Sequence, residues 1–370
     1  MTRLAIPVTG RAARVREHLD GVEAMLVSDL TNIRWLTGFT GSNGVAVVLA
    51  DRIVLVTDGR YGEQAAQQME HSGCIGEVRV GRTGAEIDAH VATLVGEVER
   101  LGFESAHTSH QRFVHLTDIL RPPLVPVVGL VERGRRTKDC AEIELISHAC
   151  AIADQALTEV APSIRPGRTE AEIRNSLEVR MRELGASGPS YDTIVATGPA
   201  NSPLPHHRPT DTVIEAGHTL IIDVGALVDG YHSDMTRSFV IGPPTIDQQR
   251  VYDAVLAAQV AGVAAVRPGL EARELDGICR DVLTDAGLGD WFTHGTGHGV
   301  GLLIHEDPFV NASATWVLQE GDVVTVEPGA YRGGFGGIRV EDLVEVTASG
   351  CRTLTTSPKD APCLPSPPTT

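Results

Sequence analysis

Apolar residues recur along the first part of the chain in two patterns, one typical of strands and the other of helices. Residues 45–49 and 53–56 are short β-rich runs, and residues 61–69 have helical spacing. Further on, Asp139 and Glu142 stand at the capping-box interval, and apolar residues at helical spacing follow them. The pattern predicts an α/β (α+β) fold.

Composition along the chain predicts where its parts divide. With 370 residues the chain fits two domains. The segment that begins at Arg121 is rich in proline and then basic, and the residues from Ser357 onward are rich in Pro, Ser and Thr. The predicted parts are an amino-terminal domain at residues 1–132, a linker at 133–139, a second domain at 140–356 and an unstructured, Pro-rich tail at 357–370.

A weak internal repeat divides the second domain. Each copy begins with a Pro-Gly pair, and a glutamate and then a helix-ending glycine follow it at the same intervals in both copies. The matching positions are Pro166, Glu172 and Gly185 in the first copy and Pro268, Glu274 and Gly287 in the second. Such a match can arise by chance, so alone it favours neither a real repeat nor a coincidence. If the repeat is real, it predicts two similar halves that face each other across a shared cleft.

Overall composition restricts the classes of function. The chain is 42% hydrophobic and 21% charged, which is typical of a globular protein, and its net charge of −17 argues against a nucleic-acid partner. No apolar stretch is long enough to cross a membrane, and the segment from Met1 to Leu19 lacks the apolar core of a signal peptide. Six scattered cysteines without a C-x-x-C pair are typical of reduced thiols. We therefore expect a cytoplasmic protein.

Two aspartates flank a predicted hairpin in the second domain. Asp229-Gly230 between two β-rich runs predicts a type I′ turn, which places residue 223 opposite residue 236. Asp234 is then the diagonal neighbour of Asp223 on the same face. A buried carboxylate needs hydrogen-bond donors, an arginine or a metal ion, and for Asp223 alone these alternatives remain open.

Two glutamates and three histidines extend this pattern. Glu327 and Glu341 each lie in a β-rich run, where a single acid is ordinarily solvated. His294, His298 and His305 lie among glycines whose spacing fits neither a dinucleotide-binding loop nor an H-E-x-x-H zinc motif. Four converging carboxylates and one neutral imidazole would balance the charge of two divalent metal ions. Oxygen-rich ligands with one nitrogen suit manganese, cobalt or zinc alike. Of these three metals we expect manganese.

These residues resemble the metal site of the creatinase/aminopeptidase P family of M24-type metallopeptidases, which includes Xaa-Pro dipeptidase and has the pita-bread fold. The interval from Asp223 to Asp234 is the one found in that family, and so is the interval from His298 to Glu327. Glu341 lies in the matching segment Gly-Gly-Ile-Arg-Val-Glu-Asp. The five residues that the resemblance implies as metal ligands are Asp223, Asp234, His298, Glu327 and Glu341.

The resemblance extends beyond the ligands. His206, which precedes Asp223, and His305, which follows His298, stand at the spacing of the family's substrate-facing histidines. Residues 32–41 are similar to its amino-terminal signature. The resemblance implies a creatinase-like amino-terminal domain followed by a pita-bread domain with pseudo-two-fold halves. The loop at 198–206 is slightly longer than the resemblance implies.

The resemblance also implies roles for the residues. The expected reaction is hydrolysis of Xaa-Pro peptide bonds by hydroxide that the metal ions activate, with Glu327 as the proton shuttle. His206 and His305 would bind the substrate and stabilise the intermediate. His294 and Arg339 would support catalysis, with Arg339 near the substrate and orienting Glu341. His207 and His232 are expected to be solvated or to lie behind the ligands.

Two other functions remain open. One is an Xaa-Pro aminopeptidase that acts on longer peptides. The other, less favoured because all five ligand positions hold ligand-type residues, is a non-catalytic peptide-binding relative. The expected partners are short proline-containing peptides and, as the resemblance implies, a second copy of the chain in a homodimer.

Overall fold

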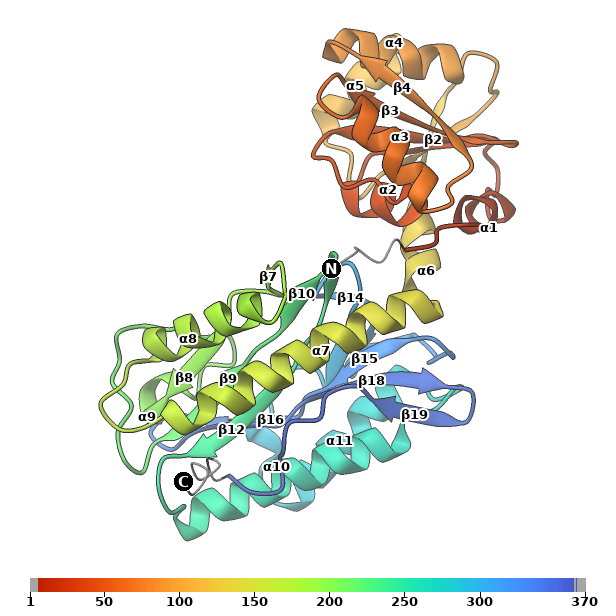
Figure 1. Ribbon diagram of the computed structural model, residues 1–370. Helices are drawn as coiled ribbons and strands as arrows, with labels where there is room; N and C mark the ends of the chain where they lie inside the picture. Colours follow the sequence, from red (N-terminus) through yellow and green to blue (C-terminus); the bar gives the residue numbers. More distant parts are fainter. Residues whose placement is uncertain (1–5, 363, 365–370) are drawn as a thin grey trace. The chain divides into compact units, whose positions relative to one another are not determined.

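The computed structural model describes residues 6–362 and 364, and the chain separates into two units between Arg135 and Arg136 (Figure 1). None of the described helices is long and apolar enough to cross a membrane. Five described cysteines, at positions 74, 140, 150, 279 and 351, are free, whereas Cys363 lies outside the described residues.

The first unit contains a mixed six-stranded sheet with the strand order β4-β3-β2-β1-β5-β6. The predicted runs at 45–49 and 53–56 form its antiparallel strands β2 and β3, and the predicted helix at 61–69 is α3. The strands are β1 (Ala24–Val27), β2 (Gly44–Val48), β3 (Ile53–Asp58), β4 (Gly76–Gly81), β5 (Leu101–Glu104) and β6 (Leu124–Val127). The helices are α1 (Arg11–Glu17), α2 (Leu30–Thr37), α3 (Gly62–His71), α4 (Gly84–Leu94), α5 (His110–Ile119) and α6 (Leu130–Arg136).

The segment predicted as a linker is partly helical. Residues 133–136 form the end of α6, so the structure differs from the predicted irregular connection there. A Cβ atom at Gly134 would lie 2.7 Å from the Trp35 ring, so the missing side chain lets α6 pack closely on that ring. A packing contact far away in the sequence therefore orders a stretch that composition alone marks as a connection.

The second unit holds three more sheets and a hairpin between two pairs of helices. The strand orders are β11-β10-β7, β12-β9-β8, β14-β13-β15-β18-β19 and the pair β16-β17. The helices are α7 (Cys140–Val160), α8 (Glu170–Glu183), α9 (Gly198–Asn201), α10 (Ile246–Ala265) and α11 (Ala272–Asp285), with 3₁₀ turns η1 (Ala161–Ser163) and η2 (Gly289–Trp291). The strands are β7 (Gly188–Pro189), β8 (Ile194–Thr197), β9 (Thr219–Asp223), β10 (Ala226–Val228), β11 (Tyr231–His232), β12 (Thr236–Val240), β13 (Gly297–Gly299), β14 (Glu306–Val310), β15 (Val323–Val326), β16 (Gly329–Arg332), β17 (Gly336–Arg339), β18 (Asp342–Thr347) and β19 (Gly350–Thr353).

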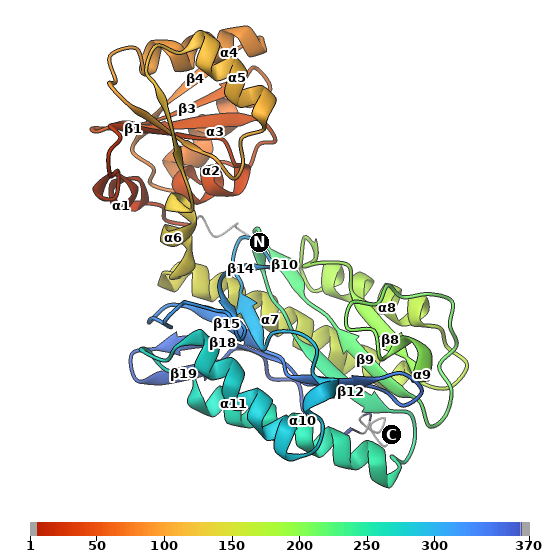
Figure 2. The ribbon, with the colours of Figure 1, turned by 180° about the vertical axis from the view of Figure 1, so that it is seen from behind.

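The internal repeat is present in the backbone of the second unit. Helices α8 and α11 are both 14 residues long and begin shortly after Gly167 and Gly269, the glycines of the two Pro-Gly pairs. Each of these glycines donates its N–H to a carbonyl on a later segment, that of Ile214 in the first copy and that of Leu318 in the second. Helices α7 and α8 pack together on one half of the unit (Figure 1), and α10 and α11 pack together on the other (Figure 2). Helix α10 also contacts β15 and β17. The two similar halves predicted from the sequence are thus confirmed.

The long helix α7 begins at the predicted capping box. The Asp139 side chain accepts a hydrogen bond from the Glu142 N–H at 3.0 Å, and the Glu142 side chain accepts one from the Asp139 N–H at 3.0 Å. The backbone N–H groups of both Asp139 and Glu142 therefore have hydrogen-bond partners at the start of the helix.

Replacing Asp139 with alanine is expected to lower the free energy of unfolding of the full chain by about 1 kcal/mol, because the first turn of α7 loses its cap. Urea denaturation measures this loss. Gln155→Ala on the same helix, where the exposed side chain bonds to Glu159, is the matched control and should change stability by less than about 0.5 kcal/mol. Equal losses in both variants would contradict the role of the cap.

The predicted tail is ordered at its start. Asp154 on α7 accepts hydrogen bonds from the N–H and hydroxyl groups of both Thr356 and Ser357. Further on, Lys359 Nζ contacts Asp342. The prediction of an unstructured tail is therefore wrong for residues 357–362, because side-chain contacts order a stretch without helix or strand. The rest of the predicted tail, apart from residue 364, lies outside the described residues.

Candidate metal centre

The predicted hairpin places Asp223 and Asp234 side by side. Asp229 and Gly230 join β10 to β11, and both have positive φ, 43° and 77°, as a type I′ turn requires. The same register continues into β9 and β12, where Thr236 pairs with Asp223. The register predicted from the sequence is confirmed, and Asp234 lies diagonally from Asp223.

The second half repeats this arrangement with two glutamates. Strands β15 and β18 are antiparallel, with Val326 paired to Asp342, so Glu327 and Glu341 are the next residues of each strand in that register. The Glu341 N–H donates to the Thr236 carbonyl at 3.2 Å, which ties this end of β18 to the first hairpin. Each half therefore supplies two acids from the ends of one antiparallel strand pair.

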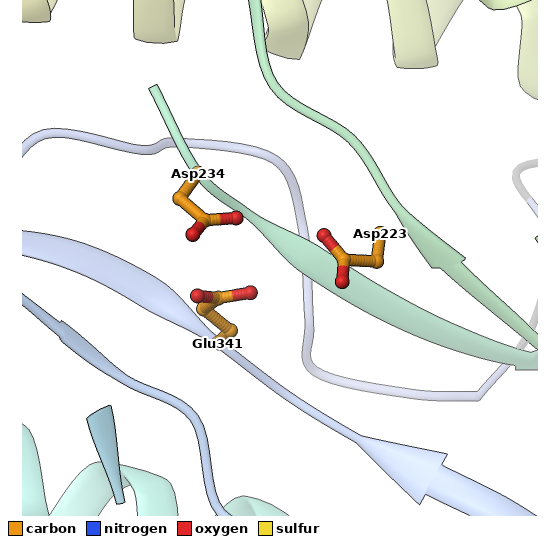
Figure 3. A group of neighbouring side chains, drawn as sticks. All are labelled: Asp223, Asp234 and Glu341. Atoms are coloured by element: carbon orange, nitrogen blue, oxygen red, sulfur yellow. The ribbon is translucent and has the colours of Figure 1, made fainter. Parts of the chain in front are cut away.

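The acids of the two halves converge. Carboxylate oxygens of Asp223, Asp234 and Glu341 all lie within 4.8 Å of one another, and the three side chains point toward a common centre (Figure 3). The Nε2 atom of His298 lies 3.5 Å from Asp234 Oδ2 and 3.5 Å from Glu327 Oε1. The structure thus brings together all five residues that the sequence resemblance implies as ligands.

The electrostatics of this cluster favour a bound cation. Burial raises the pKa of the Asp234 carboxyl well above its ordinary value, and the charges of Asp223 and Glu327 raise it further. Burial raises the pKa of Glu341 in the same way, with the charges of Asp234 and Glu327 adding to it. Burial and their mutual repulsion therefore oppose the ionisation of these carboxylates. Divalent ions would remove that repulsion.

The orientation of His298 fits the same conclusion. Its Nδ1 lies 3.1 Å from the Gly299 carbonyl oxygen, which can only accept, so Nδ1 carries the proton of the neutral ring. The lone pair on Nε2 then faces two carboxylates, an arrangement that is repulsive while both are ionised and that a metal ion between them would stabilise. One imidazole nitrogen and four carboxylates form a donor set suited to divalent first-row metals.

One tyrosine in contact with the cluster is not predicted by any pattern in the sequence. The Tyr191 hydroxyl lies within hydrogen-bond distance of Oδ1 of both Asp223 and Asp234, at 2.6 Å from the latter. One hydroxyl proton cannot satisfy two ionised acceptors, so this contact also indicates how crowded the acids are. Tyr191 follows Gly188-Pro-Ser in a connection between α8 and β8, which gives no periodic signal.

Arg339 contacts a different acid from the one we expected. Its Nη2 donates to Asp223 Oδ2 at 2.6 Å, and its Nε donates to Thr236 Oγ1 at 2.9 Å. The Thr236 hydroxyl in turn donates to Glu341 Oε2 at 2.7 Å, so hydrogen bonds connect Arg339 to Glu341 through Thr236. The arginine therefore orients one acid from each half.

A second tyrosine, also absent from the sequence predictions, connects Arg339 to His294. Arg339 Nη1 donates to Tyr331 Oη at 2.9 Å, and Tyr331 Oη lies 2.9 Å from His294 Nε2. The His294 Nδ1 proton faces the Gly295 carbonyl oxygen at 2.8 Å, so Nε2 accepts from the tyrosine. His294 thus lies at the end of a hydrogen-bond chain. Burial raises the pKa of Glu327, and the interaction of that acid with His294 opposes this rise.

The remaining histidines differ in exposure. The His305 ring packs edge-on against the His298 ring, with centroids 4.3 Å apart, and His206 is exposed. Burial lowers the pKa of His305, whose ring contact with His298 places it beside the cluster. Of the two histidines expected to be solvated or to lie behind the ligands, His207 is buried and bonds to Glu170, and His232 is half-buried with its Nδ1 bonded to Ser190. Burial lowers the pKa of His232 to about 4.

Comparisons with known proteins agree with this geometry. The sequence profile described as "Metallopeptidase family M24" matches residues 144–348, and "Creatinase/Prolidase N-terminal domain" matches residues 11–137. The uncharacterized peptidase YqhT of Bacillus subtilis is 38% identical over 350 residues, which are 92% of this chain and 95% of that protein.

Two solved structures show the same fold. The Xaa-Pro dipeptidase from Bacillus anthracis has a TM-score of 0.92 and 38% identity, covering 95% of this chain and 99% of that one. The X-Pro aminopeptidase from Thermotoga maritima has a TM-score of 0.85 and 35% identity, covering 93% of this chain and 98% of that one. The fold is therefore shared by a protein described as a dipeptidase and by one described as an aminopeptidase.

Proposed function

Because this chain belongs to metallopeptidase family M24, with a creatinase/prolidase amino-terminal domain, we propose that it is a metal-dependent exopeptidase that hydrolyses Xaa-Pro bonds. The observation that carries the proposal is the convergence of Asp223, Asp234 and Glu341 within 4.8 Å, beside His298. The dipeptidase from Bacillus anthracis, which matches over nearly the whole chain, supports the substrate class.

The proposed metal site comprises two divalent ions held by Asp223, Asp234, His298, Glu327 and Glu341. We propose manganese as the natural metal, because four carboxylates and one imidazole suit it, with cobalt or zinc as alternatives. Divalent ions held there would make a water molecule acidic enough to attack near neutral pH and would polarise the carbonyl oxygen of the substrate.

The side chains around the site would carry the remaining steps. Glu327, whose Oε1 lies 3.5 Å from His298 Nε2, would take a proton from the attacking water and pass it to the leaving proline nitrogen. His206 and His305, both exposed, would bind the substrate and donate to the oxygen that becomes negatively charged. Arg339 fixes the orientation of Asp223 by the 2.6 Å hydrogen bond to Oδ2. Tyr331 accepts a hydrogen bond from Arg339 and bonds to His294, so both residues help to hold the arginine in place.

A second candidate is an Xaa-Pro aminopeptidase that acts on longer peptides. The X-Pro aminopeptidase from Thermotoga maritima, 35% identical with a TM-score of 0.85, favours it. The two activities differ in whether the residue after the scissile bond ends in a free carboxylate, and relative rates on Xaa-Pro and Xaa-Pro-Yaa separate them. We also propose a cytoplasmic homodimer, as the resemblance implies, and sedimentation of the full chain tests its size.

Hydrolysis before and after chelation tests the proposal. The full chain loaded with Mn²⁺ should hydrolyse Xaa-Pro or Xaa-Pro-Yaa peptides, and removal of the metal should lower kcat/KM by at least about a thousandfold, because the attacking water loses its activation. Readdition of Mn²⁺ should restore the activity. The matched peptides with alanine in place of proline serve as controls for specificity. Binding of the peptides without hydrolysis by the metal-loaded chain would overturn the catalytic function and favour a non-catalytic relative.

A further inference from the structure

A buried carboxylate outside the metal site accepts hydrogen bonds from both ends of the loop that carries His206. Glu170, the first residue of α8, is fully buried. Its Oε1 accepts from the Thr197 N–H at 2.8 Å and from Asn201 Nδ2 at 3.0 Å. Its Oε2 accepts from His207 Nε2, the Thr210 N–H and the Thr210 hydroxyl, each at 2.9 Å. One side chain therefore holds both ends of the segment 197–210.

His206 lies between two anchored neighbours in this segment. On one side, the Pro205 carbonyl accepts a hydrogen bond from Arg339 Nη1 at 3.1 Å, and the same arginine holds Asp223. On the other side, the His207 ring is tied to Glu170 and is only 9% exposed. The His206 side chain is exposed between them, so the position of its ring depends on these two ties.

We propose that Glu170 is a positioning residue that sets where His206 meets the substrate, an inference that rests on the proposed function. It acts through the backbone of residues 197–210 and does not touch the reacting atoms. A misplacement of about 1 Å in a group that binds the reacting centre can cost about a hundredfold in rate. Loss of this tether therefore lowers catalysis while the metal ligands stay in place.

The chemistry of the contact requires a carboxylate. All five groups that face Glu170 donate in these contacts, and an ionised carboxylate accepts on both oxygens. The amide of glutamine presents an NH₂ group on one side, where it meets at least two of these donors whichever way it is turned. Glu170→Gln therefore removes the hydrogen bonds that hold one end of the loop, while the size of the side chain stays the same.

Kinetics in two backgrounds tests whether Glu170 acts through His206. In the Mn²⁺-loaded full chain, Glu170→Gln should lower kcat/KM for the preferred proline peptide by about 10- to 100-fold at unchanged metal content. In a His206→Ala background the same substitution should cost less than about threefold, because its effect is already lost. The control Glu172→Gln, further along α8 at an exposed position and still able to form the capping box, should stay within about twofold of wild type.

Hydrogen exchange gives a readout that does not depend on activity. The amides of Thr197 and Thr210 both donate to Glu170, so exchange in residues 197–210 should be at least about tenfold faster in Glu170→Gln and unchanged in Glu172→Gln. If Glu170→Gln does not fold, His207→Ala, which removes one tie and leaves the others, should give the same pattern more weakly. Unchanged exchange, or an equal kinetic cost with and without His206, would overturn the inference. A wild-type chain without hydrolysis would instead overturn the proposed function, and the exchange data would still decide whether the tether exists.

Discussion

Replacing Asp234 with asparagine is expected to lower kcat/KM for proline peptides by about a thousandfold or more and to reduce the metal bound per chain. Asp234 lies at the centre of the cluster: its carboxylate faces Asp223 and Glu341 within 4.8 Å and lies 3.5 Å from His298 Nε2. Asparagine keeps the shape but removes the negative charge and one of the two acceptor oxygens. Kinetics and metal analysis of the same preparation measure both effects.

The same substitution in the turn of the hairpin provides the control. Asp229 occupies a position with φ of 43°, which asparagine adopts readily, so Asp229→Asn should keep the fold and the activity. A chain with Asp234→Asn that kept the metal content and the rate of the Asp229→Asn variant would show that Asp234 is not a ligand.

Arg237→Met is expected to lower the free energy of unfolding by about 3–5 kcal/mol, the largest effect on stability that we predict, because a buried ion pair loses one partner. Arg237 is 1% exposed, and its guanidinium donates to Asp342 Oδ1 at 2.9 Å and to the Ser357 carbonyl at 2.9 and 2.7 Å. Methionine leaves the buried Asp342 with less compensation and the carbonyl oxygen of Ser357 without these donors. Urea denaturation of the full chain, with the metal removed, measures the loss.

An ion pair with an exposed arginine on strand β19 is the matched control. Arg352 on β19 pairs with Glu345 on β18 at 2.6 Å, and 59% of the arginine side chain is exposed. Surface pairs contribute about 0–1 kcal/mol, so Arg352→Met should cost less than about 1 kcal/mol. Similar losses for the two variants would mean that burial of the Arg237 pair does not increase its contribution to the free energy of unfolding.

The parts of the fold that the sequence predicted depend on local signals. The Asp229-Gly230 turn sets the register of the hairpin, and this register places Asp234 diagonally from Asp223. The capping box at Asp139 likewise fixes the start of α7. The repeat could be read because its Pro-Gly turns and helices keep equal intervals. In each case the signal lies within a short segment of the chain.

The features that the sequence did not predict depend on contacts between distant segments. Tyr191 meets Asp223 and Asp234 across 32 and 43 residues, and Glu170 meets Thr210 across 40. From the sequence, Glu170 is an ordinary acid in the first turn of a helix, where it favours the helix dipole. The tail was predicted to be unstructured from its composition, yet Asp154, far earlier in the chain on α7, orders its start. Such partners become visible only once the fold brings them together.

Anomalous diffraction from crystals grown with Mn²⁺ tests the metal centre most directly. The proposal predicts two strong peaks per chain, both bounded by Asp223, Asp234, His298, Glu327 and Glu341. Peaks at other positions would contradict the proposal. So would the absence of any peak, if the chain still hydrolyses proline peptides after chelation.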